Sequence, residues 1–272
     1  MQRIGFAFNP TREHTVELRD RALDWCRGRS VDAWSSEAAD YDALVGQLAD
    51  SDCLVVLGGD GTFLRAARAL ATVDVPVLGV NSGHVGFLSK VEADALDGAL
   101  AALVDGKYEL ENRMMLAATL GDREFAALND AAVVRGSQVR VVEMEVLIDG
   151  THLATWLADG VVVATPTGST AYSFSAGGPI LDPTSRNLVV TPIAAYLAAI
   201  RSIVVSPAHR VVVRIIDGGD CLLSIDGRED HPIGIGDSVE VRALERPLRL
   251  VEPHGTLPFW ELLRRKAALL PG

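Results

Sequence analysis

Residues 53–62 read CLVVLGGDGT, and this stretch decides the fold of the first part of the chain. Its first half, Cys53–Leu57, is continuously apolar, which predicts a strand buried on both faces in a parallel sheet. Glycines follow at once, and residues from about 63 to 71 have the pattern of a helix. A glycine-rich turn between a buried strand and a helix is typical of the ligand-binding edge of an α/β sheet.

Strands and helices alternate on both sides of this stretch. Residues 4–8 and 77–80 are short apolar runs that predict further strands, and residues 15–27 carry apolar side chains at helical spacing. This alternation predicts an α/β domain over residues 1–108, with a Rossmann-like parallel sheet flanked by helices.

Short β-like runs replace this pattern from about Tyr108 onward, and they predict a mostly antiparallel all-β domain over residues 109–254. Asp-Gly pairs, which favour tight hairpin turns, recur in this part. They are Asp149-Gly150, Asp217-Gly218 and Asp226-Gly227. Within residues 255–272, the segment 259–270 (FWELLRRKAALL) predicts a helix that returns to pack on the first domain.

Composition excludes several classes of protein. The 272 residues carry a net charge of −11, which argues against a nucleic-acid partner, because duplex binding needs a basic surface. The longest apolar run, residues 188–200, is too short to cross a bilayer, so no membrane association is expected. The chain shows no signal-peptide pattern at residues 1–10. The lysines, Lys90, Lys107 and Lys266, do not follow a glycine-rich loop, which excludes a GxxxxGK[ST] phosphate loop.

The cysteines and histidines give no metal-ligand spacing. Cys26, Cys53 and Cys221 lie far apart without a CxxC pair, which predicts buried thiols in a reduced, cytoplasmic protein and disfavours a zinc site. The six histidines are equally scattered, so His84 and the others are interpreted as packing or surface residues. No residue is predicted to be a metal ligand.

Asp60, within Gly58–Thr62, is the first candidate for chemistry. Glycines let backbone N–H groups approach phosphates, and the following helix N-terminus favours an anion. A carboxylate beside phosphates is repulsive unless it accepts a proton from an attacking hydroxyl or holds Mg²⁺. The alternative is a plain strand-to-helix turn in which Asp60 or Thr62 caps the helix.

The other candidates lie in the β-rich part. Residues 159–179 contain TPTGSTAYSFSAGGP after a strand, and small hydroxyl residues with one aromatic, Tyr172, suit a nucleotide surface better than a spacer loop. Asn129 and Asp130 are a polar pair inside the apolar stretch FAALNDAAVV. Such a pair needs partners and suits a ribose diol, although an Asn-Asp turn is an equal alternative.

In this order and at this spacing, these motifs resemble the NAD kinase family. The matching segments are GGDGTFLRAA, LND and DGVVVATPTGSTAYSFSAGGPIL, with a further match at residues 79–89, GVNSGHVGFLS. The resemblance runs from about Ile4 to Glu252. It implies transfer of a terminal phosphoryl group from ATP or polyphosphate to the 2′-hydroxyl of the adenosine ribose of NAD, giving NADP.

The resemblance implies a role for each matching residue. Asp60 resembles the catalytic base, Gly61 lies beside the substrate, and the loop of Gly58, Gly59 and Thr62 receives donor phosphates with Arg65 nearby. Asn129 and Asp130 resemble the ribose-binding pair. The other positions are Thr170, Ala171 and Tyr172 as the adenine platform, Asp159 and Ser175 at the nicotinamide half, and Arg140 at a position that is often basic.

The family also implies Mg²⁺ or another divalent cation, NAD and ATP as small-molecule substrates, and a homodimer or homotetramer. Departures from the usual pattern are Asp130 for Glu, Tyr196 for His and Arg228 for Gln. The last two bear on the choice between NAD and NADH. A lipid or sugar kinase with a GGDG-like loop is disfavoured by the TPTGSTAY block, and an intact Asp60 disfavours a non-catalytic dinucleotide-binding regulator.

Overall fold

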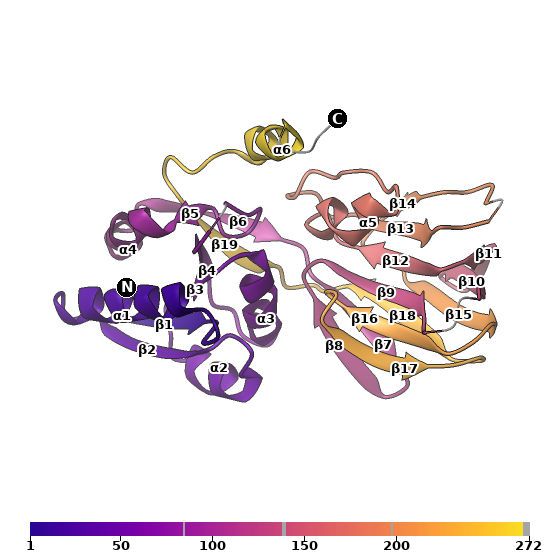
Figure 1. Cartoon of the computed structure of the whole chain (residues 1–272), viewed down its shortest axis with the longest axis horizontal. Coiled ribbons are helices and arrows are strands. Elements are labelled where there is room, and N and C mark those ends of the chain that lie inside the picture. Colours follow the sequence, from indigo (N-terminus) through magenta and orange to yellow (C-terminus); the bar gives the residue numbers. More distant parts are fainter. Residues whose placement is uncertain (84, 138–139, 197, 269–272) are drawn as a thin grey trace. The chain divides into compact units, whose positions relative to one another are not determined.

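The computed structural model describes residues 1–268 except 84, 138–139 and 197 (Figure 1). His84, interpreted above as a packing or surface residue, therefore lies outside the described part. The chain divides into two compact units: unit 1 joins Met1–Asn112 to the segment that begins at Leu248, and unit 2 is Arg113–Pro247.

Unit 1 contains a sheet of largely parallel strands, as expected for an α/β domain. The strand order is β2-β1-β3-β4-β19-β6, with β5 also on β4, and β1–β2, β1–β3, β3–β4, β4–β5 and β4–β19 all pair in parallel. The strands are β1 (Arg3–Phe8), β2 (Asp32–Glu37), β3 (Cys53–Leu57), β4 (Val77–Asn81), β5 (Val91–Glu92), β6 (Tyr108–Arg113) and β19 (Leu248–Pro253).

Strand β19 makes the boundary between the units differ from the one expected at residue 254. The sequence places it in the β-rich domain because it resembles the strands before it. In the structure, Leu250 pairs with Val77 of β4, so β19 belongs to the sheet of unit 1. The chain therefore returns to unit 1 before its last helix.

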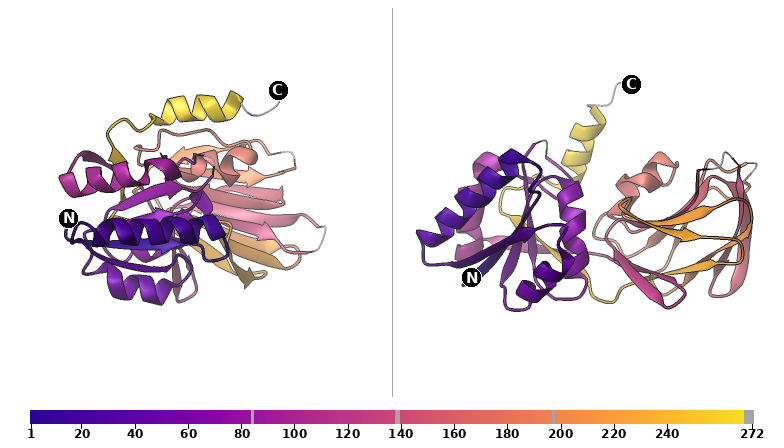
Figure 2. Two further views of the ribbon diagram at one scale, coloured as in Figure 1. Left: turned by 60° about the vertical axis from the view of Figure 1, so that its left-hand side comes forward. Right: turned by 60° about the horizontal axis from the view of Figure 1, so that its bottom comes forward.

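Helices cover both faces of this sheet (Figure 2). Helices α1 and α4 pack against each other on one face, where Ile4, Phe6 and Phe8 of β1 join their apolar side chains in one buried cluster. Helices α2 and α3 pack together on the other face. The helices are α1 (Glu13–Arg27), α2 (Tyr41–Leu48), α3 (Asp60–Leu70), α4 (Leu96–Asp105), preceded by the 3₁₀ turn η1 (Ala93–Ala95), and α6 (Phe259–Ala268).

Helix α3 begins at Asp60 rather than at residue 63, so three of the five residues of GGDGT are helical. Gly59 is the N-cap, and its carbonyl accepts the N–H groups of Thr62 and Phe63 at 2.8 and 3.1 Å. An acidic residue in the first turn is favoured because it faces the positive end of the helix dipole.

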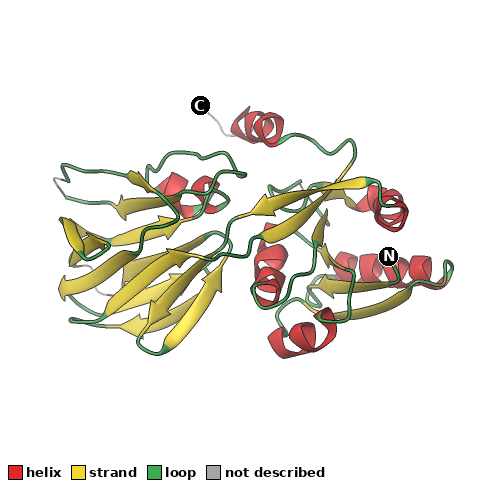
Figure 3. Cartoon of the chain, turned by 180° about the vertical axis from the view of Figure 1, so that it is seen from behind, coloured by secondary structure: helices red, strands yellow, loops and turns green. Residues whose placement is uncertain are grey.

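Unit 2 is a sandwich of two antiparallel sheets, as the β-rich pattern predicts. Figure 3 shows it as strands, with helix confined, among its described residues, to the 3₁₀ turn η2 (Gly168–Thr170) and the short helix α5 (Tyr172–Ser175). The first sheet has the order β11-β10-β15-β18-β7-β8 and the second β14-β13-β12-β9-β16-β17. Val146 and Trp156 of the first sheet and Val161 and Val163 of the second share one apolar core.

The strands of unit 2 are β7 (Leu116–Leu120), β8 (Arg123–Ala127), β9 (Asp130–Arg135), β10 (Val142–Ile148), β11 (Thr151–Ala158), β12 (Gly160–Ala164), β13 (Leu188–Ile193), β14 (Ile203–Val205), β15 (Val211–Asp217), β16 (Cys221–Ile225), β17 (Glu229–Ile233) and β18 (Ser238–Ala243).

Two of the three expected hairpin turns are confirmed. Asp149-Gly150 joins β10 to β11, and Asp226-Gly227 joins β16 to β17, with positive φ at both residues of each pair. This is the geometry that Asp-Gly favours. The hairpin expected at Asp217-Gly218 is wrong, because β15 and β16, which flank it, belong to different sheets.

The C-terminal helix is confirmed over Phe259–Ala268, and the expected residues 269–270 lie outside the described part. It returns to unit 1, since Phe259 is buried and its ring centroid lies 5.6 Å from that of Phe87. No helix in the described ranges is long and apolar enough to cross a membrane.

Candidate active site

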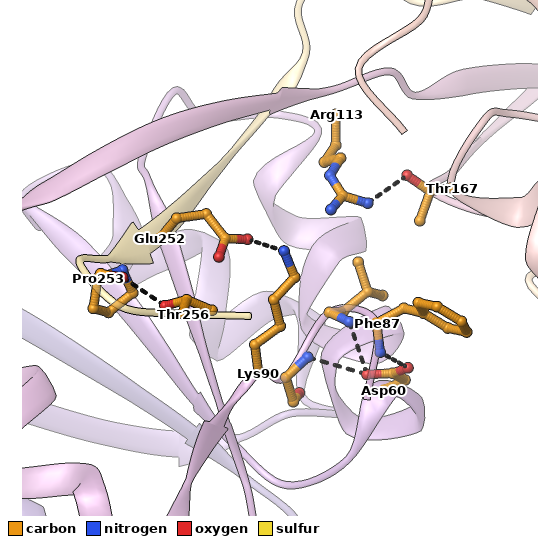
Figure 4. A network of polar contacts seen from close by, with 10 residues as sticks. Asp60, Phe87, Lys90, Arg113, Thr167, Glu252, Pro253 and Thr256 are labelled. Carbon is orange, nitrogen blue, oxygen red and sulfur yellow. Dashed lines mark hydrogen bonds and ion pairs between the residues drawn. The ribbon is translucent and has the colours of Figure 1, made fainter. Parts of the chain in front are cut away.

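The carboxylate of Asp60 is held by the backbone of a neighbouring loop in unit 1. The N–H of Phe87 donates to Oδ2 at 2.8 Å, and those of Leu88 and Ser89 donate to Oδ1 at 3.1 Å each (Figure 4). Asp60 lies directly beyond the carboxyl end of β3, the edge at which open α/β sheets bind ligands. Its side chain is thus fixed in one orientation at the expected place.

Gly86 leaves room for this contact. A Cβ atom at Gly86 would lie 1.9 Å from Oδ1 of Asp60, which no side chain tolerates. The same loop is closed by a hydrogen bond of 3.0 Å from the N–H of Gly86 to the carbonyl of Ser89. The sequence segment GVNSGHVGFLS therefore supplies the support for Asp60, a function that its composition does not reveal.

Two further contacts hold the loop within unit 1. The ring of Phe87 lies against Phe259 of α6, and Lys266 Nζ lies 5.2 Å from the ring centroid of Phe87. Just beyond the loop, Lys90 Nζ contacts Glu252 Oε1 at 2.6 Å, with side-chain exposures of 6% and 16% (Figure 4). One of the few lysines of this chain is therefore a buried structural residue.

The remaining expected residues of unit 1 lie at the start of α3. The N–H of Gly58 donates to the carbonyl of Val80 at 2.8 Å, which fixes the turn after β3. Gly61 and the buried Thr62 form the first turn of the helix, and Arg65 is exposed on it.

In unit 2, a pocket of about 400 Å³ gathers four of the expected residues: Asn129, Asp130, Ala171 and Tyr172. Tyr172 is 42% exposed, so a face of its ring is open to a ligand, whereas Asp130 is only 4% exposed. The rest of the lining is Ala132, Val134, Leu222, Ser224, Asp226, Gly227 and Asp230. Two residues of the expected adenine platform, Ala171 and Tyr172, therefore line one pocket with the expected ribose pair.

The pocket holds one buried carboxylate, Asp130, and one partly buried carboxylate, Asp226. Burial raises the pKa of Asp130 from 3.8 to about 7, and the charge of Asp226 adds to this shift. Burial also raises the pKa of Asp226, against the lowering effect of hydrogen bonds from the N–H groups of Leu128, Asn129 and Asp130. In the sequence, Asp226 is recognisable only as a turn residue, because its partners lie almost 100 positions away.

Asp159 is paired with Arg135, a residue that the sequence does not single out. Arg135 Nε donates to Asp159 Oδ1 at 2.8 Å, and both side chains are about one-third exposed. Burial raises the pKa of Tyr172, and the charges of Asp159 and Asp130 add to this, against the opposite effect of Arg135.

The other expected residues are not part of the pocket lining. Thr170 Oγ1 donates to the carbonyl of Thr167 at 3.1 Å, and Ser175 is exposed at the end of α5. Arg140 pairs with Asp217 at 3.1 Å, with both side chains more than half exposed. Tyr196 is 68% exposed and its backbone bridges to Leu157.

Within the described residues, no group of three or more His, Cys, Asp or Glu side chains is arranged to hold a metal ion. All three cysteines are buried free thiols.

Family models match both parts of the chain. The ATP-NAD kinase N-terminal domain matches residues 5–108, and the ATP-NAD kinase C-terminal domain matches residues 128–253. The chain belongs to the ATP-NAD kinase family. Membership assigns it the activity of the family, ATP-dependent phosphorylation of NAD to NADP, which is a phosphotransferase reaction.

Curated NAD kinases are similar in sequence to most or nearly all of this chain. An NAD kinase of Syntrophotalea carbinolica is 36% identical over 284 aligned positions, which cover 98% of both chains. An NAD kinase of Symbiobacterium thermophilum is 45% identical over 221 positions, covering 79% of this chain and 78% of the relative.

Solved structures share the fold. A yeast NADH kinase complexed with NADH has a TM-score of 0.85 at 24% identity, with 99% of this chain and 87% of that chain covered. An Archaeoglobus fulgidus NAD kinase in complex with ATP has a TM-score of 0.81 at 23% identity, with 99% and 100% covered.

Proposed function

We propose that Asp60 is the general base that accepts the proton of the 2′-hydroxyl of the adenosine ribose while ATP donates its terminal phosphoryl group. The observation that carries this is the orientation of its carboxylate by three backbone N–H groups. A carboxylate offers about four lone-pair positions, so roughly one, on Oδ2, stays open for a substrate proton. Phosphoryl transfer needs mainly such alignment and charge neutralisation.

The pocket of unit 2 is proposed to bind the adenosine half of NAD. Tyr172, with Thr170 and Ala171 beside it, offers an aromatic face to adenine, and Asn129 and Asp130 offer an amide and a carboxyl to the ribose. Its volume of about 400 Å³ suits one nucleoside. Asp159 and Ser175 are proposed contacts of the nicotinamide half.

The phosphates are proposed to contact the turn of Gly58, Gly59, Gly61 and Thr62, where the N-terminus of α3 favours an anion, with Arg65 exposed on the same helix. Arg140, which the resemblance places near the substrate, is paired with Asp217 in the structure, and we assign it no role.

Mg²⁺ fits this arrangement as a companion of ATP. Mg²⁺ commonly keeps water ligands and binds through nucleotide phosphates with one or two carboxylates, so a three-ligand protein cluster is not required. When bound, it supplies charge neutralisation at the transferred phosphoryl group. We further infer a cytoplasmic homodimer or homotetramer, and the buried free thiols agree with a reducing compartment.

A second role for Asp60 is supported by the same hydrogen bonds: it would anchor residues 86–89 without taking a proton. The two roles differ kinetically. Loss of a base lowers kcat and leaves substrate KM nearly unchanged, whereas loss of an anchor that shapes the site also changes KM.

An assay of NADP formation tests the proposed reaction. The chain is incubated with ATP or polyphosphate, and with NAD or NADH, with Mg²⁺ present. The proposal predicts NADP from ATP and NAD, and almost none for Asp60→Asn. A chain that phosphorylates neither dinucleotide with either donor contradicts it, and activity with polyphosphate alone would overturn ATP as the donor.

A further inference from the structure

The segment Leu128–Asp130 is held at all six of its backbone polar groups by two residues. The carboxylate of Asp226 accepts the N–H of Leu128 at 3.1 Å, of Asn129 at 2.7 Å and of Asp130 at 3.1 Å. The N–H of Asp226 donates to the carbonyl of Asp130 at 2.9 Å. Thr165 provides the rest: its Oγ1 donates to the carbonyl of Leu128 at 2.5 Å, and its N–H to that of Asn129 at 2.8 Å.

Strand register explains how these two residues reach the segment. Strand β9 lies between β12 and β16 in its sheet, as Figure 1 shows. Asp130, the first residue of β9, pairs with Ala164, the last of β12, and Ala131 pairs with Ile225, the last of β16. Thr165 and Asp226 are the next residues along their strands. Both therefore continue past the start of β9 on either side of it.

The backbone of Leu128–Asp130 is tightly packed against its neighbours. Thr165 is fully buried, and a Cβ atom at Gly168 would lie 2.1 Å from the carbonyl oxygen of Asn129. Asn129, Asp130 and Asp226 all line the pocket of about 400 Å³. A fixed backbone with side chains at the pocket wall is what pre-organised binding requires, because little conformational entropy is lost when the ligand arrives.

We propose that Thr165 and Asp226 are positioning residues for NAD: they hold the backbone of Leu128–Asp130 and thereby aim Asn129 and Asp130 into the pocket. The inference rests on the proposed function in one respect, that this pocket receives the adenosine half of NAD. Neither residue needs to touch the substrate.

Three substitutions test the inference. Thr165→Val keeps the volume and the N–H but removes the donor to Leu128, and Thr165→Ser restores that donor. Asp226→Asn keeps Oδ1 for Asn129 and Asp130 but turns an N–H₂ group toward the N–H of Leu128. Asp149→Asn is the matched control: Asp149 occupies the equivalent Asp-Gly turn of another hairpin and accepts the N–H of Arg210 at 2.9 Å.

The measurements are kcat, KM for NAD and for ATP, the dissociation constant of NAD by calorimetry, and the melting temperature. Thr165→Val and Asp226→Asn are expected to raise KM and Kd for NAD at least about tenfold, since a buried hydrogen bond is lost under the binding pair. KM for ATP stays within about twofold, and Thr165→Ser and Asp149→Asn bind NAD with the KM and Kd of the wild type.

Unchanged NAD binding in folded Thr165→Val and Asp226→Asn overturns the inference. So does an equal change in KM for both substrates, which marks general destabilisation. If Thr165→Val does not fold, Asp226→Asn carries the test with the same expected and contrary results. Tyr172→Ala distinguishes failure of this inference from failure of the proposed function. If Tyr172→Ala also binds NAD normally, the pocket is not the NAD site and the proposed function of the pocket fails. If Tyr172→Ala alone weakens NAD binding, only the inference on Thr165 and Asp226 fails.

Discussion

A Cβ atom at Gly86 would lie 1.9 Å from Oδ1 of Asp60. The carboxylate of Asp60, the proposed general base, therefore fits only because residue 86 has no side chain. Oδ1 also accepts the N–H groups of Leu88 and Ser89, so displacing it disturbs the whole contact.

Gly86→Ala is expected to lower kcat at least about tenfold, because a small misplacement of a reacting group costs much of its effect. Gly98→Ala is the matched control. Gly98 lies in α4, an added Cβ there meets nothing within 4 Å, and alanine favours the helix. Steady-state rates of both variants check the prediction, and equal rates would show that the contact with Gly86 does not position Asp60.

The sequence predicts the fold where the pattern is local. Cys53–Leu57 is recognisable because all its residues are apolar, and the Asp-Gly pairs at 149–150 and 226–227 are turns of the expected kind. The sequence does not predict strand β2, because Asp32–Glu37 is an edge strand of mixed polarity and carries no apolar run. The sequence does not indicate that strand β19 joins the sheet of unit 1, because its pairing with β4 spans more than 160 positions.

In the candidate site, too, the residues in local motifs are predictable from the sequence, and the long-range contacts are not. Asp60, Asn129 and Tyr172 stand out in the sequence because they sit in dense motifs. The residues that hold these side chains in place do not stand out in the sequence. Asp226 contacts Asn129 across 97 positions, and Phe87 contacts Asp60 across 27. Such contacts depend on the register of strands and on loop closure, and composition and spacing contain neither.

Tyr172→Ala is expected to raise KM for NAD by roughly tenfold with a smaller effect on kcat, since stacking on a base contributes about 1–3 kcal/mol. Tyr172→Phe keeps the aromatic face and should bind NAD like the wild type. Initial rates at varied NAD check both. A Tyr172→Ala enzyme with an unchanged KM would mean that the exposed ring does not contact the substrate.

Asp130→Asn is expected to be more stable than the wild type at pH 8 by at least about 1 kcal/mol, and by less at pH 5. The pKa of Asp130 is raised to about 7, so the folded state binds a proton that the unfolded state releases near pH 4. Wild-type stability therefore falls as the pH rises between these values. Asparagine carries no such charge.

Urea unfolding at pH 5 and pH 8 gives this comparison. Asp149→Asn provides a control of opposite sign, because hydrogen bonds from Arg210 and His209 lower the pKa of Asp149. Loss of this carboxylate in Asp149→Asn should destabilise the protein at pH 8. A stability difference between Asp130→Asn and the wild type that does not vary with pH would contradict the raised pKa.

Lys90→Met is expected to destabilise the protein by about 3–5 kcal/mol, because it leaves the carboxylate of Glu252 without its buried cation. The double variant Lys90→Met with Glu252→Met should recover much of this loss. Lys107→Met is the control, since the ion pair of Lys107 with Asp105 is exposed and contributes little. Chemical unfolding measures all three, and equal effects of the two lysine substitutions would rule out a special role for burial.

The most direct test of Asp60 as general base is the kcat of Asp60→Asn, measured with KM for NAD and for ATP at saturating levels of the other substrate. A positioned base contributes roughly 10²–10⁴ in rate, so kcat should fall by about that factor while both KM values stay within about threefold. A kcat near that of the wild type, or a kcat loss matched by a large rise in KM, would contradict the assignment and leave Asp60 as the anchor of residues 86–89.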